Sequence, residues 1–344
     1  MNKLIIQIPC LNEEDQLPGT LAALPREVPG FDQVEWLIID DGSTDRTVEV
    51  ARARGVDHVV RLPRNRGLAN AFQAGLDASL KLGADVIVNT DADNQYSADD
   101  IPSLVEPIVS GVADIVVGSR DVRNHREFSS LKIRLQLLGS WTVRKASGTD
   151  VPDATSGFRA YSREAALGLT VVNQYTYTIE SLIQAGRHNA AIVSVPIATN
   201  PKVRESRLFG SMLSYVSRNA VTIGRVFAAY EPLKFFGWLS VLLFLGGLLA
   251  FAPFVIDWLR TGDTSGHLQS IILGAIGILA AIQVGALAVV ADLVAGQRAV
   301  AQRTLERVRR LELDAEVEPS HYHGDHPSEP VSDRGWSDIY ERSG

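Results

Sequence analysis

Two aspartates separated by a single residue, Asp91 and Asp93, follow a short apolar run and precede Gln95. Carboxylate and amide oxygens are the ligands that Mg²⁺ and Mn²⁺ prefer, and these ions commonly share the phosphates of a bound substrate. A metal held here would neutralise the charge that builds on a leaving diphosphate. The same residues also suit a turn before Ser97, and two aspartates at this spacing are common by chance. For the motif taken alone, the structural role in a turn is therefore the favoured interpretation.

Two further polar loops follow apolar runs nearer the N-terminus. Asn12 and Glu13 come after Pro9, and the run Asp-Asp-Gly-Ser-Thr-Asp occupies residues 40–45. Asp, Gly and Ser are frequent in turns, so a structural role can account for either loop by itself. Their carboxylate and amide groups can equally accept hydrogen bonds from a nucleobase or a ribose. The order of these loops along the chain is more informative than any one of them.

Strand and helix patterns alternate through the first 120 residues. Apolar runs predict buried strands at residues 4–8, 34–39, 59–62, 86–88 and 115–117. Amphipathic stretches predict helices at residues 13–24, 45–53, 69–82 and 98–109. This alternation predicts an α/β fold with a mostly parallel sheet and helices on both faces. Ligands bind such sheets beyond the carboxyl ends of the strands, so the polar loops are expected to converge at one edge.

These motifs, in this order, resemble glycosyltransferase family 2 and its GT-A nucleotide-diphospho-sugar fold. The matching residues are Pro9, Asn12, Glu13, residues 40–45, 65–67, Asp91, Asp93, Gln95, residues 118–120 and residues 153–159. The resemblance covers residues 3–207. Within the family, the chain is most similar to dolichyl- or undecaprenyl-phosphate sugar transferases that carry C-terminal membrane helices.

The resemblance implies a donor site and a metal site. Asp41, Asn12 and Glu13 are expected at the nucleoside, with Asp91 near the ribose and the sugar. Asp93 and Gln95, together with Asp91, are expected to hold Mg²⁺ or Mn²⁺. The expected donor-binding residues are Pro9, Asn12, Glu13, Asp41, Asn65, Gly67 and Asp91.

The family inverts the anomeric carbon, and its processive synthases carry a Gln-x-x-Arg-Trp motif. The nearest string here, residues 136–141, lacks the arginine, which disfavours a polymer synthase.

The role of Asp153 depends on the acceptor. A hydroxyl acceptor is a weak nucleophile that needs a general base, and Asp153 would be that base. A phosphate monoester has a second pKa of about 6, so it is mostly dianionic at pH 7 and needs cations instead. Asp153 would then orient the acceptor or a neighbouring arginine. The candidate catalytic residues are Asp153, Arg120 and Arg207, and the candidate acceptor-phosphate ligands are Arg120, Arg204, Arg207 and Arg134.

Two uncharged apolar runs, residues 235–256 and 268–291, predict a transmembrane hairpin. As helices they would be about 33 to 36 Å long, which exceeds a hydrocarbon core of about 30 Å. Basic residues flank the hairpin on both outer sides: Arg218, Arg225, Lys234, Arg298, Arg303, Arg307, Arg309 and Arg310. The positive-inside rule therefore places both ends in the cytoplasm. We expect a multi-pass protein of the cell's inner (plasma) membrane.

The sequence predicts four parts. Residues 1–207 form a cytoplasmic GT-A catalytic domain, and residues 208–232 form an amphipathic segment that lies on the membrane or docks on the domain. The hairpin occupies residues 233–294, and residues 295–344 form a helix and, after about residue 316, a disordered tail, in which His321, His323 and His326 are solvated. Glycine-rich spans and a helix at 297–313 could pair with a second copy.

Three functions fit these features. The first is transfer of a hexose from a UDP- or GDP-sugar to polyprenyl phosphate at the cytoplasmic membrane face. The alternative is a family 2 transferase acting on a hydroxyl of a glycolipid or cell-wall polysaccharide. The third is a nucleotide-binding scaffold or transporter subunit, which is disfavoured because spans without internal charge offer no polar pathway. A net charge of −7 argues against a nucleic-acid partner.

Overall fold

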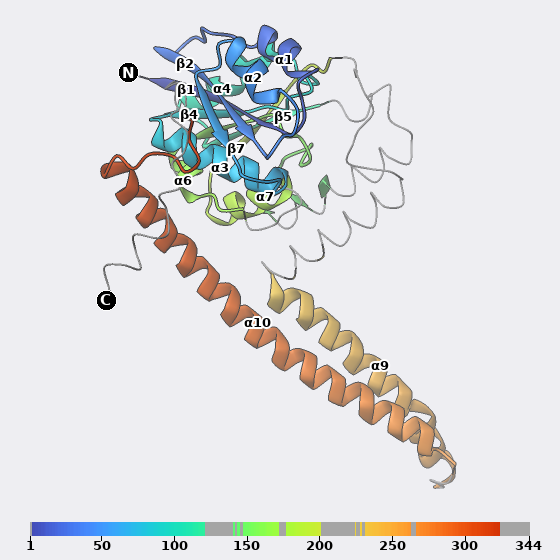
Figure 1. Cartoon of the computed structure of the whole chain (residues 1–344). Coiled ribbons are helices and arrows are strands. Elements are labelled where there is room, and N and C mark those ends of the chain that lie inside the picture. The colour runs from blue at the N-terminus through green and yellow to red at the C-terminus, as the bar shows by residue number, and fades with distance from the viewer. Residues whose placement is uncertain are drawn as a thin grey trace, which may run out of the picture.

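The computed structural model describes residues 2–120, 140–141, 143–144, 147–171, 177–200, 224, 228, 231–262 and 266–323 (Figure 1). An N-terminal α/β part is followed by two long C-terminal helices. Arg134, Arg204 and Arg207 lie outside the described residues, as does nearly all of the predicted segment 208–232. Their predicted roles stay predictions.

A seven-stranded sheet forms the centre of the α/β part, in the order β3-β2-β1-β4-β6-β5-β7. The strands are β1 (Lys3–Cys10), β2 (Gln33–Asp40), β3 (His58–Arg61), β4 (Val86–Asn89), β5 (Ile115–Ser119), β6 (Arg159–Ser162) and β7 (Ile192–Pro196). All neighbours are parallel except β6, which runs antiparallel to both β4 and β5. The prediction of a mostly parallel sheet is confirmed. The sequence predicts β1 to β5 but misses β6 and β7.

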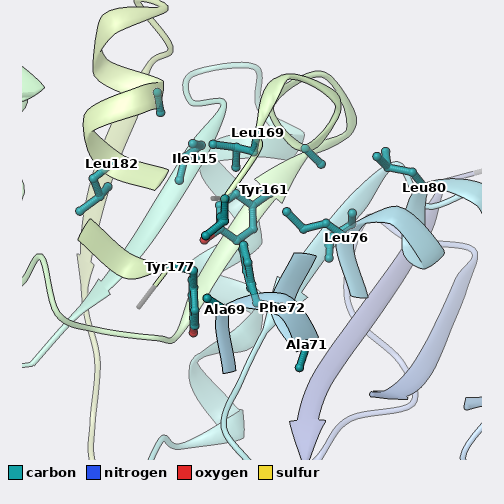
Figure 2. Packing of buried hydrophobic residues seen from close by; sticks show 14 of the residues in the cluster. Ala69, Ala71, Phe72, Leu76, Leu80, Ile115, Tyr161, Leu169, Tyr177 and Leu182 are labelled. Carbon is teal, nitrogen blue, oxygen red and sulfur yellow. The ribbon is translucent and has the colours of Figure 1, made fainter. Parts of the chain in front are cut away.

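Helices cover both faces of the sheet because the strands are apolar on both sides. Ile5 and Ile6 of β1 belong to opposite hydrophobic clusters, as the alternation of side chains in a strand requires. Figure 2 shows one cluster, in which Phe72 stacks on Tyr177 with ring centroids 3.9 Å apart. The helices are α1 (Leu17–Ala23), α2 (Thr47–Ala53), α3 (Leu68–Lys81), α4 (Ile101–Val109), α6 (Arg163–Gly168), α7 (Thr178–Arg187), α9 (Pro232–Thr261) and α10 (Leu268–Asp314), with the 3-10 helix η1 (Ala98–Asp100) before α4.

Helices α9 and α10 pack against each other as a hairpin (Figure 1). A Cβ atom on Gly247 would lie 2.9 Å from the backbone nitrogen of Ile278, so glycine permits this close approach. Ser240 also donates a hydrogen bond to the carbonyl of Ala281 at 2.8 Å. Both helices are long and apolar enough to cross a membrane. Large side chains such as Trp238 are mostly exposed, which suits a lipid surround.

The C-terminal part of α10 and the residues after it dock on the α/β part. Buried Arg309 donates hydrogen bonds to the carbonyls of Leu167 and Leu169 at 3.0 and 2.7 Å. Beyond the helix, the chain pairs with the edge strand β3, where Tyr322 bridges Val60. Further hydrogen bonds join the His321 carbonyl to the Arg61 nitrogen at 3.0 Å and the His323 nitrogen to the Val59 carbonyl at 2.9 Å.

The predicted disorder after residue 316 is therefore wrong for residues 317–323, and His321 and His323 are part of an ordered edge contact. The physical reason is that an edge strand presents unpaired N–H and C=O groups, which an extended segment can satisfy. His326 lies outside the described residues.

Candidate active site

The polar loops predicted at the sheet edge follow β1, β2, β3 and β4. Strand β1 lies between β2 and β4, so the chain moves outward to one side through β2 and β3 and then returns to the other side as β4. Such a reversal of strand order opens a crevice at the carboxyl ends of the strands, where ligands of α/β proteins bind. The predicted donor and metal residues therefore come from loops that border one crevice.

The loops after β1 and β2 are tied together by hydrogen bonds. The Asn12 side-chain oxygen accepts from the Thr44 nitrogen at 2.8 Å, and the Asn12 nitrogen donates to the Ser43 hydroxyl at 2.9 Å. The Glu13 nitrogen donates to the Thr47 hydroxyl at 2.9 Å. Asn12 has a φ of 54°, a left-handed conformation that asparagine tolerates better than most residues. Asn12 and Glu13 thus help to shape the crevice, whatever they do for a ligand.

Asp41 anchors the turn that follows β3. Its two carboxylate oxygens accept from the nitrogens of Arg66 and Gly67 at 2.7 and 2.9 Å. Burial raises the pKa of Asp41, although these backbone hydrogen bonds oppose the rise. The two loops approach so closely that a Cβ on Gly42 would lie 2.6 Å from the Arg64 carbonyl carbon.

The turn after β3 is also braced from within. The Asn65 side-chain oxygen accepts from the Gly67 nitrogen at 2.9 Å. Three predicted donor residues, Asp41, Asn65 and Gly67, are thereby brought together. Pro9 lies buried in β1, opposite Ile39 of β2.

Asp91 and Asp93 lie at the end of β4. Burial, together with the charges of Asp93 and Glu13, raises the pKa of Asp91 to about 7, while the charge of Arg120 opposes the shift. Asp93 accepts a hydrogen bond from the backbone nitrogen of Gln95 at 3.1 Å. Carboxylates crowded in this way favour a cation between them, because a cation offsets their mutual repulsion.

The donor set fits a hard divalent metal. Two carboxylates and an amide leave coordination positions for the oxygens of a diphosphate, the pattern that Mg²⁺ favours. Among the described residues, no group of three or more His, Cys, Asp or Glu side chains is placed to hold a metal by itself. A metal here would therefore be completed by its substrate.

A series of buried, hydrogen-bonded polar side chains lies close to Asp91, and the sequence does not predict it. Gln7 donates to the Asn89 side-chain oxygen at 2.9 Å, and Asn89 donates to the Tyr177 hydroxyl and the Gly157 carbonyl, each at 2.9 Å. A Cβ on Gly157 would lie 3.3 Å from both Asp91 oxygens, so Gly157 packs directly against that carboxylate. The hydrogen bond from Asn89 holds Gly157 in this position. The signals available in the sequence are Gln7, which interrupts the apolar run of β1, and Asn89, which ends the apolar run of β4.

Arg120 and Asp153 form a two-point ion pair beside the crevice. Arg120 Nε lies 2.7 Å from Asp153 Oδ2, and Arg120 Nη2 lies 3.1 Å from Oδ1. Nη2 also donates to the Thr155 hydroxyl at 3.0 Å. No hydrogen bond from Nη1 reaches another described residue. Burial alone would raise the pKa of Asp153, but the charge and hydrogen bonds of Arg120 outweigh it and hold this pKa below its usual range.

Arg159 is fully buried and holds the loop that carries Asp153. It donates to the carbonyls of Ser156 at 2.8 Å and Ala154 at 2.9 Å, and to α7 through the Thr178 carbonyl at 2.8 Å. Arg159 falls within the matching residues 153–159, but its type and position in the sequence indicate no role for it. Its length and five donors allow one side chain to join this loop to a helix.

Comparisons with known proteins agree with this geometry. The model of glycosyl transferase family 2 matches residues 5–168. The chain is 30% identical over 243 residues to the undecaprenyl-phosphate mannosyltransferase of Micrococcus luteus, covering 67% of this chain and 98% of that protein. It is 30% identical over 221 residues to the UDP-N-acetylglucosamine–dolichyl-phosphate N-acetylglucosaminyltransferase of Methanococcus voltae, covering 58% and 86%.

A solved structure is similar in fold. Glucosyl-3-phosphoglycerate synthase from Mycobacterium tuberculosis, in complex with phosphoglyceric acid, matches with a TM-score of 0.51 and 22% identity. The match covers 66% of this chain and 79% of that chain. At this level of identity the similarity concerns the GT-A fold, which the sequence predicts.

Proposed function

We propose that this chain, which belongs to glycosyltransferase family 2, transfers a hexose from a UDP- or GDP-sugar to polyprenyl phosphate at the cytoplasmic face of the inner membrane. The relatives named above act on undecaprenyl and dolichyl phosphates, which supports this kind of acceptor. The names of these two relatives give different sugars, mannose and N-acetylglucosamine, so they do not identify the donor sugar of this chain. The observation that carries the choice of acceptor is the ion pair between Arg120 and Asp153.

This ion pair favours a phosphate acceptor over a hydroxyl. A general base works best when its pKa lies near the operating pH. The pKa of Asp153 is instead held low, and both of its oxygens are engaged by Arg120. A polyprenyl phosphate needs no base, because it is mostly dianionic at pH 7. The Nη1 group of Arg120 can bind such a phosphate while Asp153 holds the guanidinium in place.

The donor would lie across the crevice on the loops after β1 to β4. Asn12 and Asp41 fix the two loops expected at the nucleoside, and Asp91, Asp93 and Gln95 would hold Mg²⁺ or Mn²⁺. When bound, this metal would neutralise the charge that develops on the departing nucleoside diphosphate. A phosphate oxygen of the acceptor forms the bond to the anomeric carbon as the bond to the diphosphate breaks, with inversion.

Helices α9 and α10 would anchor the enzyme next to its lipid substrate. Residues 1–207 and both termini are proposed to lie in the cytoplasm, because the basic flanks Lys234 and Arg298 adjoin the two apolar runs on that side.

A transfer assay with paired acceptors tests the proposal. Purified protein in vesicles is incubated with labelled UDP- and GDP-hexoses, Mg²⁺ or Mn²⁺, and either polyprenyl phosphate or the same polyprenol without phosphate. We expect label in the lipid extract with the phosphate only. Label transferred to the hydroxyl of the polyprenol, or no label from any of these donors by a folded protein, would contradict the proposal.

A further inference from the structure

Helix α7 is held at both ends by the hairpin helices. In its first turn, Glu180 accepts a hydrogen bond from Arg298 of α10, with 2.8 Å between Oε1 and Nη2. In its last turn, Arg187 pairs with Glu231, the residue before α9, at 2.6 Å. The first turn of α7 therefore carries the acidic partner of its ion pair with α10, and the last turn carries the basic partner of its ion pair with the start of α9. Each end of α7 thus contacts a different helix of the hairpin.

The Glu180 side chain is only 4% exposed, so its contact with Arg298 is largely shielded from water. Removing one partner of a buried ion pair leaves the other charge uncompensated, which costs far more than breaking an exposed pair. The Arg298–Glu180 contact should therefore hold its geometry firmly. The exposed Arg303, little more than one turn further along α10, makes no ion pair with the described residues.

The same first turn of α7 also reaches the acceptor side of the crevice. Arg159 Nη1 donates to the Thr178 carbonyl and to the Ser181 hydroxyl, each at 2.8 Å. The remainder of its guanidinium holds the loop of Ala154 and Ser156, which directly follows Asp153. Polar contacts, together with the short backbone segments between them, therefore link α10 through α7 to the loop that carries Asp153.

The position of these contacts along α10 is informative. Arg298 follows the predicted apolar span by seven residues, or about 10 Å of helix. The headgroup layer adds roughly 5 to 8 Å on each side of the hydrocarbon core. Arg298 is therefore expected just outside the headgroup layer, on the side of the membrane that carries the α/β part.

We propose that Glu180 and Arg298 are positioning residues, which seat α7 on the membrane hairpin and so fix the height of Arg120 above the lipid surface. This inference rests on the proposed function, since it concerns how a membrane-embedded phosphate reaches the crevice. The proposed positioning role predicts different behaviour for two kinds of acceptor. A long-chain phosphate anchored in the bilayer depends on this height, whereas a short, water-soluble isoprenyl phosphate diffuses to the crevice and does not.

The experiment compares Arg298→Gln with Arg303→Gln, which makes the same change in charge at the exposed neighbour. KM and kcat are measured for undecaprenyl phosphate in phosphatidylcholine vesicles, whose neutral headgroups remove attraction to anionic lipid, and for a short soluble isoprenyl phosphate. Arg298→Gln should raise KM for the long-chain acceptor about tenfold and change KM for the short one less than about twofold. Arg298→Lys should restore the long-chain KM to within about threefold of the original value.

A double variant tests the pairing itself. Glu180→Gln combined with Arg298→Gln should raise the long-chain KM no further than Arg298→Gln alone, because one interaction is lost in either case. An equal rise for both acceptors would overturn the inference in favour of a general folding role. An equal effect of Arg303→Gln would overturn it in favour of a non-specific charge effect.

Amide hydrogen exchange gives a readout that does not need transfer. Arg298→Gln should speed exchange at residues 178–181 and 154–157, and Arg303→Gln should not. Unchanged exchange in both segments would overturn the inference. If the unmodified protein transferred sugar to neither phosphate, the proposed function would fail, and the exchange result would still decide whether α7 is coupled to α10.

Discussion

The proposed donor side and the proposed acceptor side of the crevice are built differently. On the donor side, loops hold one another through backbone groups, as when Asp41 accepts from the nitrogens of Arg66 and Gly67. On the acceptor side, the main contact joins two charged side chains, Arg120 and Asp153. The donor side is thus a rigid frame, whereas the acceptor side presents an oriented cation.

This difference suggests that the two sides have separate roles, one in holding the nucleotide and the other in binding the acceptor phosphate. A frame made of backbone hydrogen bonds can hold a nucleotide of fixed shape, because its geometry is set before the ligand arrives. A guanidinium held from one side can receive an anion on the other, which suits a phosphate on a mobile lipid chain. Changes on the two sides should therefore have separable effects on donor binding and on transfer.

The largest effect is expected where the two sides meet, at the predicted metal. Asp93→Ala should lower transfer at least about 10³-fold, because the leaving diphosphate loses its charge neutralisation. Initial rates over a range of Mn²⁺ concentrations would measure this. Asp99→Ala, an exposed aspartate six residues further on, is the matched control and should leave the rates nearly unchanged. Full activity of Asp93→Ala would refute the metal assignment.

A smaller loss is expected on the acceptor side. Arg120→Gln should lower transfer to polyprenyl phosphate about 10²-fold, since a cation for the attacking phosphate is removed. The affinity for the nucleoside diphosphate, measured by calorimetry, should change little. A comparable loss of nucleotide affinity would show that the two sides are not separable.

The same variant should also change how stability depends on pH. In the original protein the pKa of Asp153 is lowered, so its contribution to stability is present above the unfolded pKa of about 3.9 and is lost as the pH falls through the folded pKa. Without Arg120, burial raises this pKa instead, and ionised Asp153 destabilises the fold. As the pH falls from 7 toward 5, Arg120→Gln should therefore gain more stability than the original protein, in which Asp91, with its pKa raised to about 7, already contributes a gain. Thermal unfolding of both proteins would measure this difference, and an equal response would contradict the ion pair.

The rigid frame of the donor side can be disturbed by a single methyl group. Gly42→Ala adds a Cβ only 2.6 Å from the Arg64 carbonyl carbon at a φ of +77°. It should lower the free energy of unfolding by about 1 to 3 kcal/mol and weaken nucleotide binding. Gly111→Ala is the matched control, with a φ of +71° and nothing within 4 Å. Gly111→Ala should lower the free energy of unfolding by about 1 kcal/mol from backbone strain alone and leave nucleotide affinity unchanged. Equal nucleotide affinities for the two variants would contradict the frame.

The smallest effect is expected at His58, the first residue of β3, where the C-terminal segment meets this strand. Tyr322→Phe removes the hydrogen bond between the Tyr322 hydroxyl and His58 Nδ1, which is 2.8 Å long. Because this contact is only partly buried, the free energy of unfolding should fall by about 1 kcal/mol or less. Chemical denaturation would measure this loss. Transfer rates should not change, and a large loss of transfer would show that the segment influences the crevice.

Local patterns in the sequence predict much of the donor side. Strands β1 to β5 are marked by apolar runs, and Asp41, Asp91 and Asp93 follow them at the edge where ligands bind. The sequence does not predict features that depend on contacts between distant residues. Strand β6 begins with a buried arginine, so it lacks an apolar signal. The contact of Glu180 with Arg298 joins residues 118 positions apart, and neither residue type by itself indicates its partner.

The central claim is that Asp153 orients Arg120 for a phosphate acceptor and does not act as a base. The most direct test is the pH profile of kcat for Asp153→Asn with polyprenyl phosphate between pH 6 and 9. The account predicts a loss of about tenfold, because asparagine keeps part of the contact with Arg120, and a profile of unchanged shape. A loss of about 10² to 10⁴-fold, together with the disappearance of a pH-dependent limb, is what removal of a general base would produce. That result would contradict the account and favour a hydroxyl acceptor.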